Sequence, residues 1–182
     1  MPVERFGPGL TPPERAPRTA LRLERGLPRH AEAHLVRLCT SLVAMGCEVA
    51  WLEPRMTLAL AWAREEAGAA PVLALRMLAD PASETLHVGL EAVPETPRPY
   101  TLFPMLHPLA LERDNPLAAC KGCLGPWSAG ALANARQAGA QDALLHWPDG
   151  TIGETAIAVV GLLDGRRFTL PPAAGRVRYR VP

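Results

Sequence analysis

Lys121 is the residue whose chemistry is most distinctive, because it is the only lysine in the chain. Lysine and arginine together number 19, so every other residue of this pair is arginine. A guanidinium can supply any exposed positive charge, whereas a primary amine is needed for condensation with a carbonyl group. Lys121 lies in the segment NPLAACKGCLG. The sequence therefore favours a covalent role for this amine over an incidental surface position.

The four cysteines could in principle bind a metal or exchange disulfides. Cys120 and Cys123 form a C-x-x-C pair around the lysine, but Cys39 and Cys47 are spaced too widely to complete a structural zinc site. A thioredoxin-like pair would begin a helix after a strand, whereas this pair lies in a segment broken by Gly and Pro. We expect no metal site and four buried or incidental free thiols.

Composition limits the class of protein. The chain has 182 residues, of which 48% are hydrophobic and 20% charged, which suits one good core or two small lobes. A net charge of +1 with scattered arginines predicts neither a nucleic-acid partner nor an anionic membrane surface. The sequence has no apolar run long enough to span a membrane, and its start does not resemble a signal peptide. We expect a globular, cytoplasmic protein.

Hydrophobic periodicity predicts the elements that must position the reactive residues. The first half of the chain is expected to form a strand, two helices and two strands, at 19–26, 29–46, 54–67, 71–78 and 84–93. The second half is expected to form a strand, a helix and three strands, at 100–106, 128–138, 142–147, 151–163 and 166–170. This order predicts an α+β fold with two lobes, 18–111 and 118–182, a linker over 112–117 and a loose arm over 1–17.

The helix predicted over 29–46 is amphipathic and also carries two polar residues that could contribute to a site. Leu35, Leu38 and Leu42 recur at three-to-four spacing and indicate the buried face. His34 and Arg37 are three positions apart, so they occupy neighbouring positions on one face.

Three segments, in this order, resemble the class IV aminotransferases, a family of pyridoxal-phosphate enzymes. LRLERGLPRHAEAHLVRLCTSLVAMG resembles the family's strand, Gly turn and helix with a His-x-x-Arg-Leu pattern and a following Ser. NPLAACKG resembles the segment that ends in the cofactor-binding lysine, and AGAQDALLHWPDGTIGETAIAVVGLLDGRRFTLPP resembles the stretch with the glutamate that faces the cofactor ring. The resemblance covers roughly residues 19–172. It implies a fold-type IV enzyme, with an N-terminal α/β sandwich lobe and a shortened, barrel-like C-terminal lobe.

The resemblance also implies roles for individual residues. Lys121 would bind pyridoxal 5'-phosphate covalently and transfer protons as a general acid and base. Glu154 would favour a protonated pyridine nitrogen, Arg37 would grip the phosphate and Thr155 would contact the cofactor. His34 would help to fix the same face as Arg37. The simpler interpretations are a solvated or snorkelling Arg37, a boundary His34 and a strand-edge charge at Glu154.

Several positions depart from the family pattern. Val159 stands where the family commonly has Asn, and the segment GCLGPW after the lysine offers no clear Tyr or Arg to support the cofactor. The last segment, AAGRVRYRVP, does not match the family's Gly-rich phosphate loop, so we expect a C-terminally shortened relative. Trp62, Trp127 and Trp147 are expected to be core or interface aromatics rather than substrate-stacking residues.

Among the family's activities, the segments around Lys121 and Glu154 most resemble lyase-like sequences of the folate pathway. The implied reaction converts 4-amino-4-deoxychorismate to 4-aminobenzoate and pyruvate. The alternatives are an aminotransferase for branched-chain or D-amino acids, or a degenerate non-catalytic relative that acts as a binding protein. The family builds its active sites between subunits, so a homodimer acting on a small-molecule substrate is expected.

Overall fold

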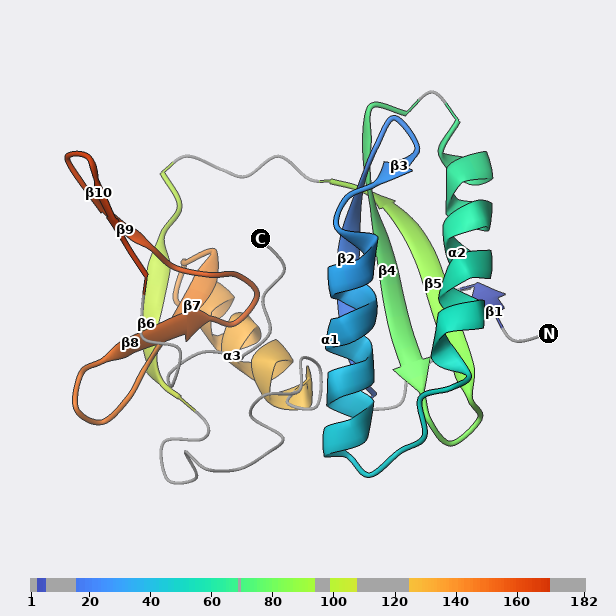
Figure 1. Cartoon of the computed structure of the whole chain (residues 1–182). Helices are drawn as coiled ribbons and strands as arrows, with labels where there is room; N and C mark the ends of the chain where they lie inside the picture. The colour runs from blue at the N-terminus through green and yellow to red at the C-terminus, as the bar shows by residue number, and fades with distance from the viewer. Residues whose placement is uncertain (1–2, 6–15, 69, 94–98, 108–124, 171–182) are drawn as a thin grey trace. The chain divides into compact units, whose positions relative to one another are not determined.

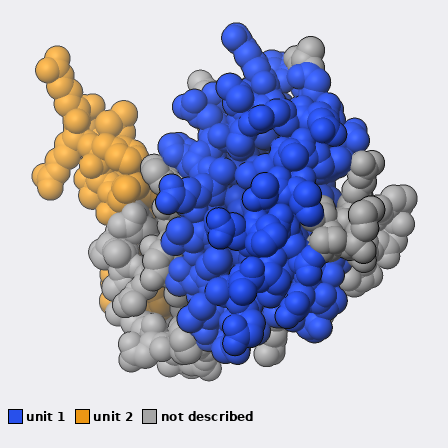
Figure 2. Space-filling model, turned by 45° about the vertical axis from the view of Figure 1, so that its right-hand side comes forward, with its two compact units in different colours: residues 1–95, 120–123, 179–182 blue, residues 96–119, 124–178 orange. Residues whose placement is uncertain are grey.

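The computed structural model of the chain describes residues 3–5, 16–68, 70–93, 99–107 and 125–170. These residues fall into two compact units, which Figure 2 colours separately. Unit 1 contains the described residues up to 93, and unit 2 contains those from 99 onward. The predicted linker over 112–117 lies outside the described residues, so the lobe boundaries stay a prediction.

Helices and strands are mixed in both units, which confirms the predicted α+β class (Figure 1). The elements of unit 1 are β1 (Val3–Arg5), β2 (Arg18–Glu24), β3 (Leu27–Pro28), α1 (Ala31–Ala44), α2 (Leu52–Ala67), β4 (Val72–Asp80) and β5 (Thr85–Ala92). The elements of unit 2 are β6 (Leu102–Leu106), α3 (Gly125–Gln137), β7 (Asp142–His146), β8 (Ile152–Thr155), β9 (Leu162–Asp164) and β10 (Arg167–Thr169).

Unit 1 is built on a five-stranded sheet in the order β1-β5-β4-β2-β3. Burial alternates along β2, so Thr19, Leu21 and Leu23 point inward while Arg18 and Arg22 point to the opposite face. Each leucine removed from water here contributes about 1.5–3 kcal/mol to folding. The core between the sheet and helices α1 and α2 consists of Leu21, Leu23, Leu38, Leu42, Leu52, Met56, Ala59, Ala63, Leu75, Met77, Ala79, Leu86 and Val88.

Helix α1 ends where the sequence predicts, at a glycine. Gly46 has a φ of 74°, and its N–H donates to the Val43 carbonyl at 2.9 Å. The Cys47 N–H donates to the Leu42 carbonyl, also at 2.9 Å. These two bonds are the Schellman pattern, which satisfies carbonyls that the helix end leaves open.

The N-terminal arm predicted to be loose contains a short strand. Residues Val3–Arg5 form β1, which pairs in parallel with Leu86, His87 and Val88 of β5. The physical reason is that β5 would otherwise present an unpaired edge, and an extended segment of any sequence can hydrogen-bond to it.

Unit 2 contains a three-stranded sheet in the order β6-β7-β8, with α3 connecting the parallel pair β6 and β7. Among the described strands β6 lies at the edge of this sheet, where the missing N–H of Pro104 is tolerated. Helix α3 packs on β7 through small side chains. The resulting cluster consists of Ala131, Ala135, Ala140, Ala143 and Leu145, with Met105, Trp127 and Ala156 against it.

The strand predicted over 151–163 is interrupted after Thr155. The Thr155 N–H donates to the Ala158 carbonyl at 2.9 Å, and the Ala158 N–H donates to the Thr155 hydroxyl at 2.7 Å. This local turn competes with strand pairing, because the hydroxyl offers the backbone a partner within the same segment. The chain then resumes as the separate hairpin of β9 and β10, whose side chains are exposed.

In the described part of the chain, none of the helices combines the length and apolar composition that crossing a bilayer requires.

Candidate functional site

One face of helix α1 carries three buried polar side chains, His34, Arg37 and Ser41. Arg37 is only 6% exposed, so the interpretation of a solvated or snorkelling arginine is wrong. The adjacent Leu38 and Leu42 are fully buried in the core of unit 1, which fixes the rotation of the helix. The helix therefore holds a permanently charged, fork-shaped donor at a defined position, as an anion-binding site requires.

His34 is tied to the sheet rather than standing at a boundary. Its Nδ1 lies 2.6 Å from the hydroxyl oxygen of Thr19 on β2, and both side chains are buried. A buried hydrogen bond of this kind fixes both the ring orientation and the distance between α1 and β2. His34 thus stabilises the helix face on which Arg37 lies.

In unit 2, strand β8 carries the two other predicted residues, Glu154 and Thr155. The register pairs Glu154 with Leu145 and Thr155 with Leu144, so the two side chains point to opposite faces of the sheet. Leu145 packs on α3, as does Ala156, so half-buried Glu154 lies on the face that α3 covers. Thr155 is buried on the other face.

The Thr155 hydroxyl is used within its own turn. It donates to the Ala158 carbonyl at 3.0 Å and accepts from the Ala158 N–H at 2.7 Å. These bonds hold the backbone directly after Glu154. The contribution of Thr155 to the site is consequently to shape this turn, and its predicted cofactor contact stays a prediction.

Lys121 lies outside the described residues, as do Cys120 and Cys123. Cys39 and Cys47 are free thiols. Burial raises the pKa of the Cys39 thiol, and the nearby carboxylate of Glu53 raises it further. Cys39 is therefore less reactive at neutral pH than an unperturbed thiol.

A histidine that the sequence analysis did not single out lies at the centre of an aromatic cluster in unit 2. The His107 ring stacks on Trp147 with centroids 4.4 Å apart, and the Trp127 ring lies 6.1 Å away. Burial lowers the pKa of His107 to about 4 from its ordinary 6.5, so the ring is neutral at physiological pH. Trp127 also packs against the α3 cluster, and Trp147 is buried, as expected of core aromatics.

Asp142 is a second residue that periodicity did not indicate as special. It begins β7 and is fully buried, and its Oδ1 accepts from the Ala143 N–H at 2.8 Å. Within the described residues, Oδ2 has no hydrogen-bond partner. The sequence signal that could have identified Asp142 is an acidic residue at the start of an apolar strand.

Comparisons with known proteins identify the family of the chain. The sequence pattern of the amino-transferase class IV family matches residues 19–178. The chain belongs to the class IV aminotransferases. The matched region includes all four residues predicted for the site, namely Arg37, Lys121, Glu154 and Thr155. Among curated protein sequences, none matches the chain closely enough to count as a relative.

Solved structures of class IV enzymes share the fold. A protein from Legionella pneumophila assigned as a 4-amino-4-deoxychorismate lyase is 17% identical, with a TM-score of 0.71; the match covers 96% of this chain and 72% of that one. A hypothetical aminotransferase from Mycobacterium tuberculosis, with α-ketoglutarate and PMP bound, is 20% identical, with a TM-score of 0.77 and coverage of 93% and 68%. An aminotransferase from Brucella abortus, bound to the cofactor PLP, is 25% identical, with a TM-score of 0.66 and coverage of 85% and 60%. The fold is therefore that of the fold-type IV enzymes.

Proposed function

We propose that the chain is a pyridoxal-phosphate-dependent enzyme in which Lys121 holds the cofactor. The observation that supports this most strongly is that the only primary amine of any side chain lies inside the family match, between Arg37 and Glu154. When bound, the cofactor would act as an electron sink for a substrate carbanion. Lys121 would bind it covalently and then move the substrate proton.

Arg37 and Glu154 fit the two polar ends of this cofactor. Arg37 is a buried guanidinium fixed by the core of α1, and a phosphate is the anion that matches its fork. Glu154 is half-buried on the sheet face that α3 covers with small apolar residues. A carboxylate in such surroundings would keep the pyridine nitrogen of the cofactor protonated. His34 and Thr155 would support these two residues rather than react.

The reaction that we propose is the lyase reaction, which releases pyruvate from 4-amino-4-deoxychorismate and leaves 4-aminobenzoate. The lyase-like sequence around Lys121 and Glu154 supports it, as does the similarity to the Legionella protein. Transamination of a branched-chain or D-amino acid is the second candidate, favoured by the higher TM-score of 0.77 to the Mycobacterium aminotransferase. The product 4-aminobenzoate would place the lyase in folate synthesis, in the cytoplasm.

A non-catalytic binding protein is the third candidate. Val159 stands where the family commonly has Asn, and its side chain is exposed directly after the Thr155 turn. A homodimer would suit each candidate, since the hairpin of β9 and β10 exposes Leu162, Leu163 and Phe168.

The decisive experiment asks whether Lys121 binds the cofactor. Addition of pyridoxal phosphate should produce a visible absorbance band, and borohydride reduction should attach one cofactor mass to the peptide that contains Lys121. Lys121→Arg should abolish both results, because a guanidinium does not condense. Labelling at the N-terminal amine alone would contradict the assignment.

Turnover assays then separate the three candidates. Release of 4-aminobenzoate from 4-amino-4-deoxychorismate supports the lyase. Keto-acid formation from branched-chain or D-amino acids, without 4-aminobenzoate release, supports the aminotransferase. Cofactor binding with neither activity supports the binding protein, and light scattering at micromolar concentration reports whether the chain dimerises.

A further inference from the structure

The turn between β2 and β3 borders a pocket that the proposed enzyme chemistry does not use. The pocket has a volume of about 440 Å³, within the range of about 300–1,000 Å³ that small-molecule sites occupy. All of its residues belong to unit 1. It is lined by Glu24, Arg25, Leu27, Arg29, Pro71 and Val72. We refer to it as the β2–β3 pocket.

Arg25 occupies a position that the turn itself does not favour. The register pairs Glu24 with Leu27, which leaves Arg25 and Gly26 as a two-residue turn with φ values of 50° and 74°. Two-residue hairpin turns with positive φ favour Asn, Asp or Gly at the first position, and other side chains are strained there. The Arg25 N–H donates to the Pro71 carbonyl at 3.1 Å, which fixes the turn against the segment before β4. An arginine held in this strained conformation suggests a use for its side chain.

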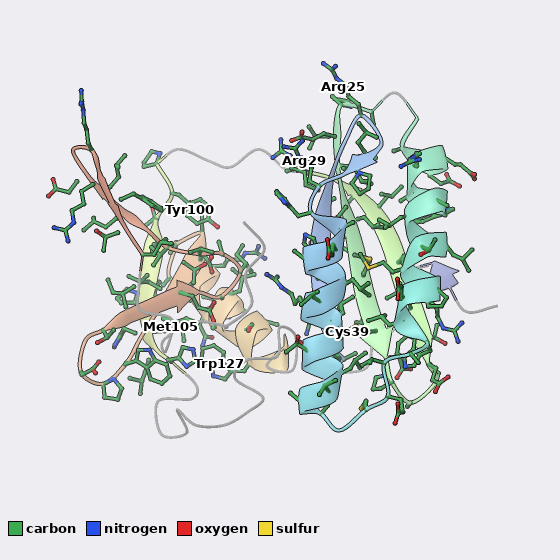
Figure 3. The ribbon with its side chains drawn as sticks, viewed as in Figure 1. Arg25, Arg29, Cys39, Tyr100, Met105 and Trp127 are labelled. Atoms are coloured by element: carbon green, nitrogen blue, oxygen red, sulfur yellow. The ribbon has the colours of Figure 1, made fainter. Side chains whose placement is uncertain are left out.

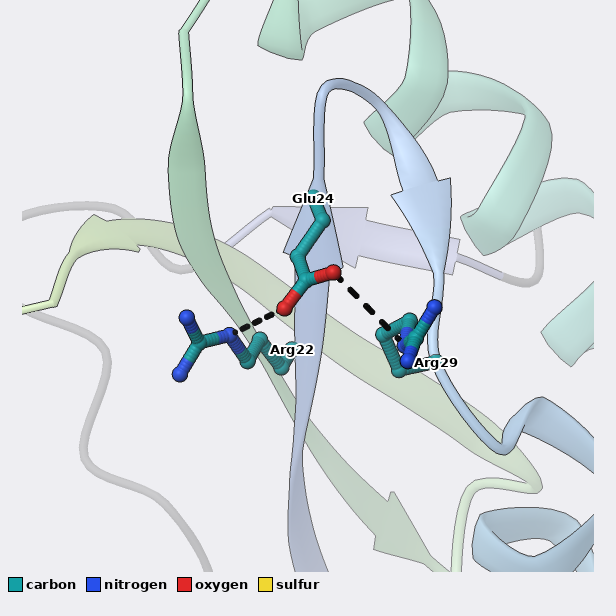
Figure 4. Close-up of polar contacts among 3 residues, drawn as sticks. All are labelled: Arg22, Glu24 and Arg29. Carbon is teal, nitrogen blue, oxygen red and sulfur yellow. Dashed lines mark ion pairs between the residues drawn. The ribbon is translucent and has the colours of Figure 1, made fainter.

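The charges around the pocket do not balance. Figure 4 shows the Glu24 carboxylate between two arginines, with Oε1 at 2.9 Å from Arg22 Nε and Oε2 at 3.7 Å from Arg29 Nε. Both contacts join the carboxylate to the Nε of a guanidinium. Arg25 forms no ion pair with any residue in the described ranges. Among the residues that line the pocket, two positive charges against one negative charge leave an excess of one.

The geometry also indicates which arginines an incoming anion would use. Arg22 is close enough to Glu24 to neutralise it, whereas the 3.7 Å contact of Arg29 is long and easily exchanged. Arg25 precedes β3 and Arg29 follows it, and Figure 3 labels both in the upper part of unit 1. Both line the pocket, so these two arginines are the candidate donors for an anion in it.

The rest of the lining is apolar. Leu27, which lies between the two arginines in the sequence, is 60% exposed. Pro71 and Val72 complete the apolar part of the lining. A ligand with only a charged group would leave this surface in water. An apolar group attached to the anion would cover it, which is favourable by the hydrophobic effect.

We propose that the β2–β3 pocket binds a small organic carboxylate, whose charged group pairs with Arg25 and Arg29 and whose apolar body packs on Leu27 and Val72. The site is independent of the proposed cofactor chemistry, because none of its residues belongs to the Arg37, Lys121 and Glu154 set.

Benzoate is the probe, and backbone amide shifts of Arg25, Gly26 and Leu27 in NMR spectra are the readout. Benzoate should shift these amides saturably. Acetate lacks the apolar body and benzyl alcohol lacks the charge, so each should bind at least about tenfold more weakly. Equal affinity for all three compounds, or shifts confined to the Arg37 region, would overturn the proposal.

Arg25→Asn separates ligand binding from stability. Asn suits the turn, so the melting temperature should rise, while benzoate affinity should fall about tenfold. Arg29→Ala should weaken binding to a similar extent. Arg76→Ala is the matched control, because it removes an arginine of the same sheet that pairs with Glu91 at 2.7 Å outside the pocket. Its benzoate affinity should equal that of the wild type.

Two outcomes of these variants would refute the proposal. In one, Arg25→Asn raises the melting temperature and leaves benzoate affinity unchanged, which assigns Arg25 no binding role. In the other, Arg76→Ala weakens binding as much as Arg29→Ala, which reduces the effect to net charge. If Arg25→Asn does not fold, Arg29→Ala decides the matter alone.

Discussion

The neutral state of His107 predicts that unit 2 loses stability as the pH falls from 7 to 5. Burial lowers the pKa of His107 to about 4, whereas the same ring in the unfolded chain titrates near 6.5. Between these values the unfolded state binds the proton more readily, so stability rises with pH across this window and falls as the pH drops. Below about pH 4 both states are protonated and no further loss occurs.

The size of the effect follows from the two pKa values. Each pKa unit corresponds to about 1.4 kcal/mol, so the full loss is about 3 kcal/mol. At pH 5 the folded ring is still mostly neutral, and the linkage gives a loss of about 2 kcal/mol relative to pH 7. This loss is a large part of the free energy of unfolding of a typical domain, which is about 5–15 kcal/mol.

Two measurements check the prediction. Exchange of the His107 amide, which donates to the His146 carbonyl at 2.8 Å, reports local opening between pH 5 and 7. His107→Phe keeps an aromatic ring against Trp147 but cannot titrate, so its unfolding free energy should lack this part of the pH dependence. Identical pH dependence of the wild type and His107→Phe, or a His107 resonance that titrates near 6.5, would refute the reasoning.

Three further predictions concern unit 1. Thr19→Val should destabilise the fold by about 1–3 kcal/mol in urea unfolding, since it removes the buried bond to His34, and Thr19→Ser should recover most of the loss. Leu38→Ala should cost about 2–5 kcal/mol in the same assay, because it leaves a cavity in the core between α1 and the sheet. Cys39 should react with iodoacetamide more slowly than free cysteine at pH 8. Glu53→Gln should accelerate this reaction, because it lowers the pKa of the Cys39 thiol. A rate equal to that of free cysteine would contradict the role of burial.

The elements of unit 1 were largely predictable because their signals are local. The three-to-four spacing of Leu35, Leu38 and Leu42, with Gly46 after the last turn, predicts α1 to within two residues at each end. Alternation along β2 likewise predicts which side chains face the helices. Periodicity alone suffices here because one face of each element is buried and the other is not.

The pairings that depend on distant residues could not be predicted in this way. The interruption after Thr155 depends on one hydroxyl that bonds Ala158, and an apolar segment offers no periodic signal for it. The stacking of His107 on Trp147 joins residues 40 positions apart (147 − 107), and hydrophobic periodicity carries no signal for a contact over that separation. Burial of Arg37 could not be predicted from helical periodicity, which alone indicated a solvated or snorkelling residue.

The register of β8 connects these observations to function. Adjacent residues of a strand point to opposite faces, so Glu154 and Thr155 cannot present their side chains to the same side of the sheet. Thr155 uses its hydroxyl to close the turn, and this fixes the backbone that follows Glu154. Val159 then lies one residue beyond that turn, with an exposed side chain that has no hydrogen-bonding group. If the cofactor binds as we propose, recognition from β8 rests on the Glu154 carboxylate, and the polar contact that the family places at the position of Val159 must be replaced elsewhere or be absent.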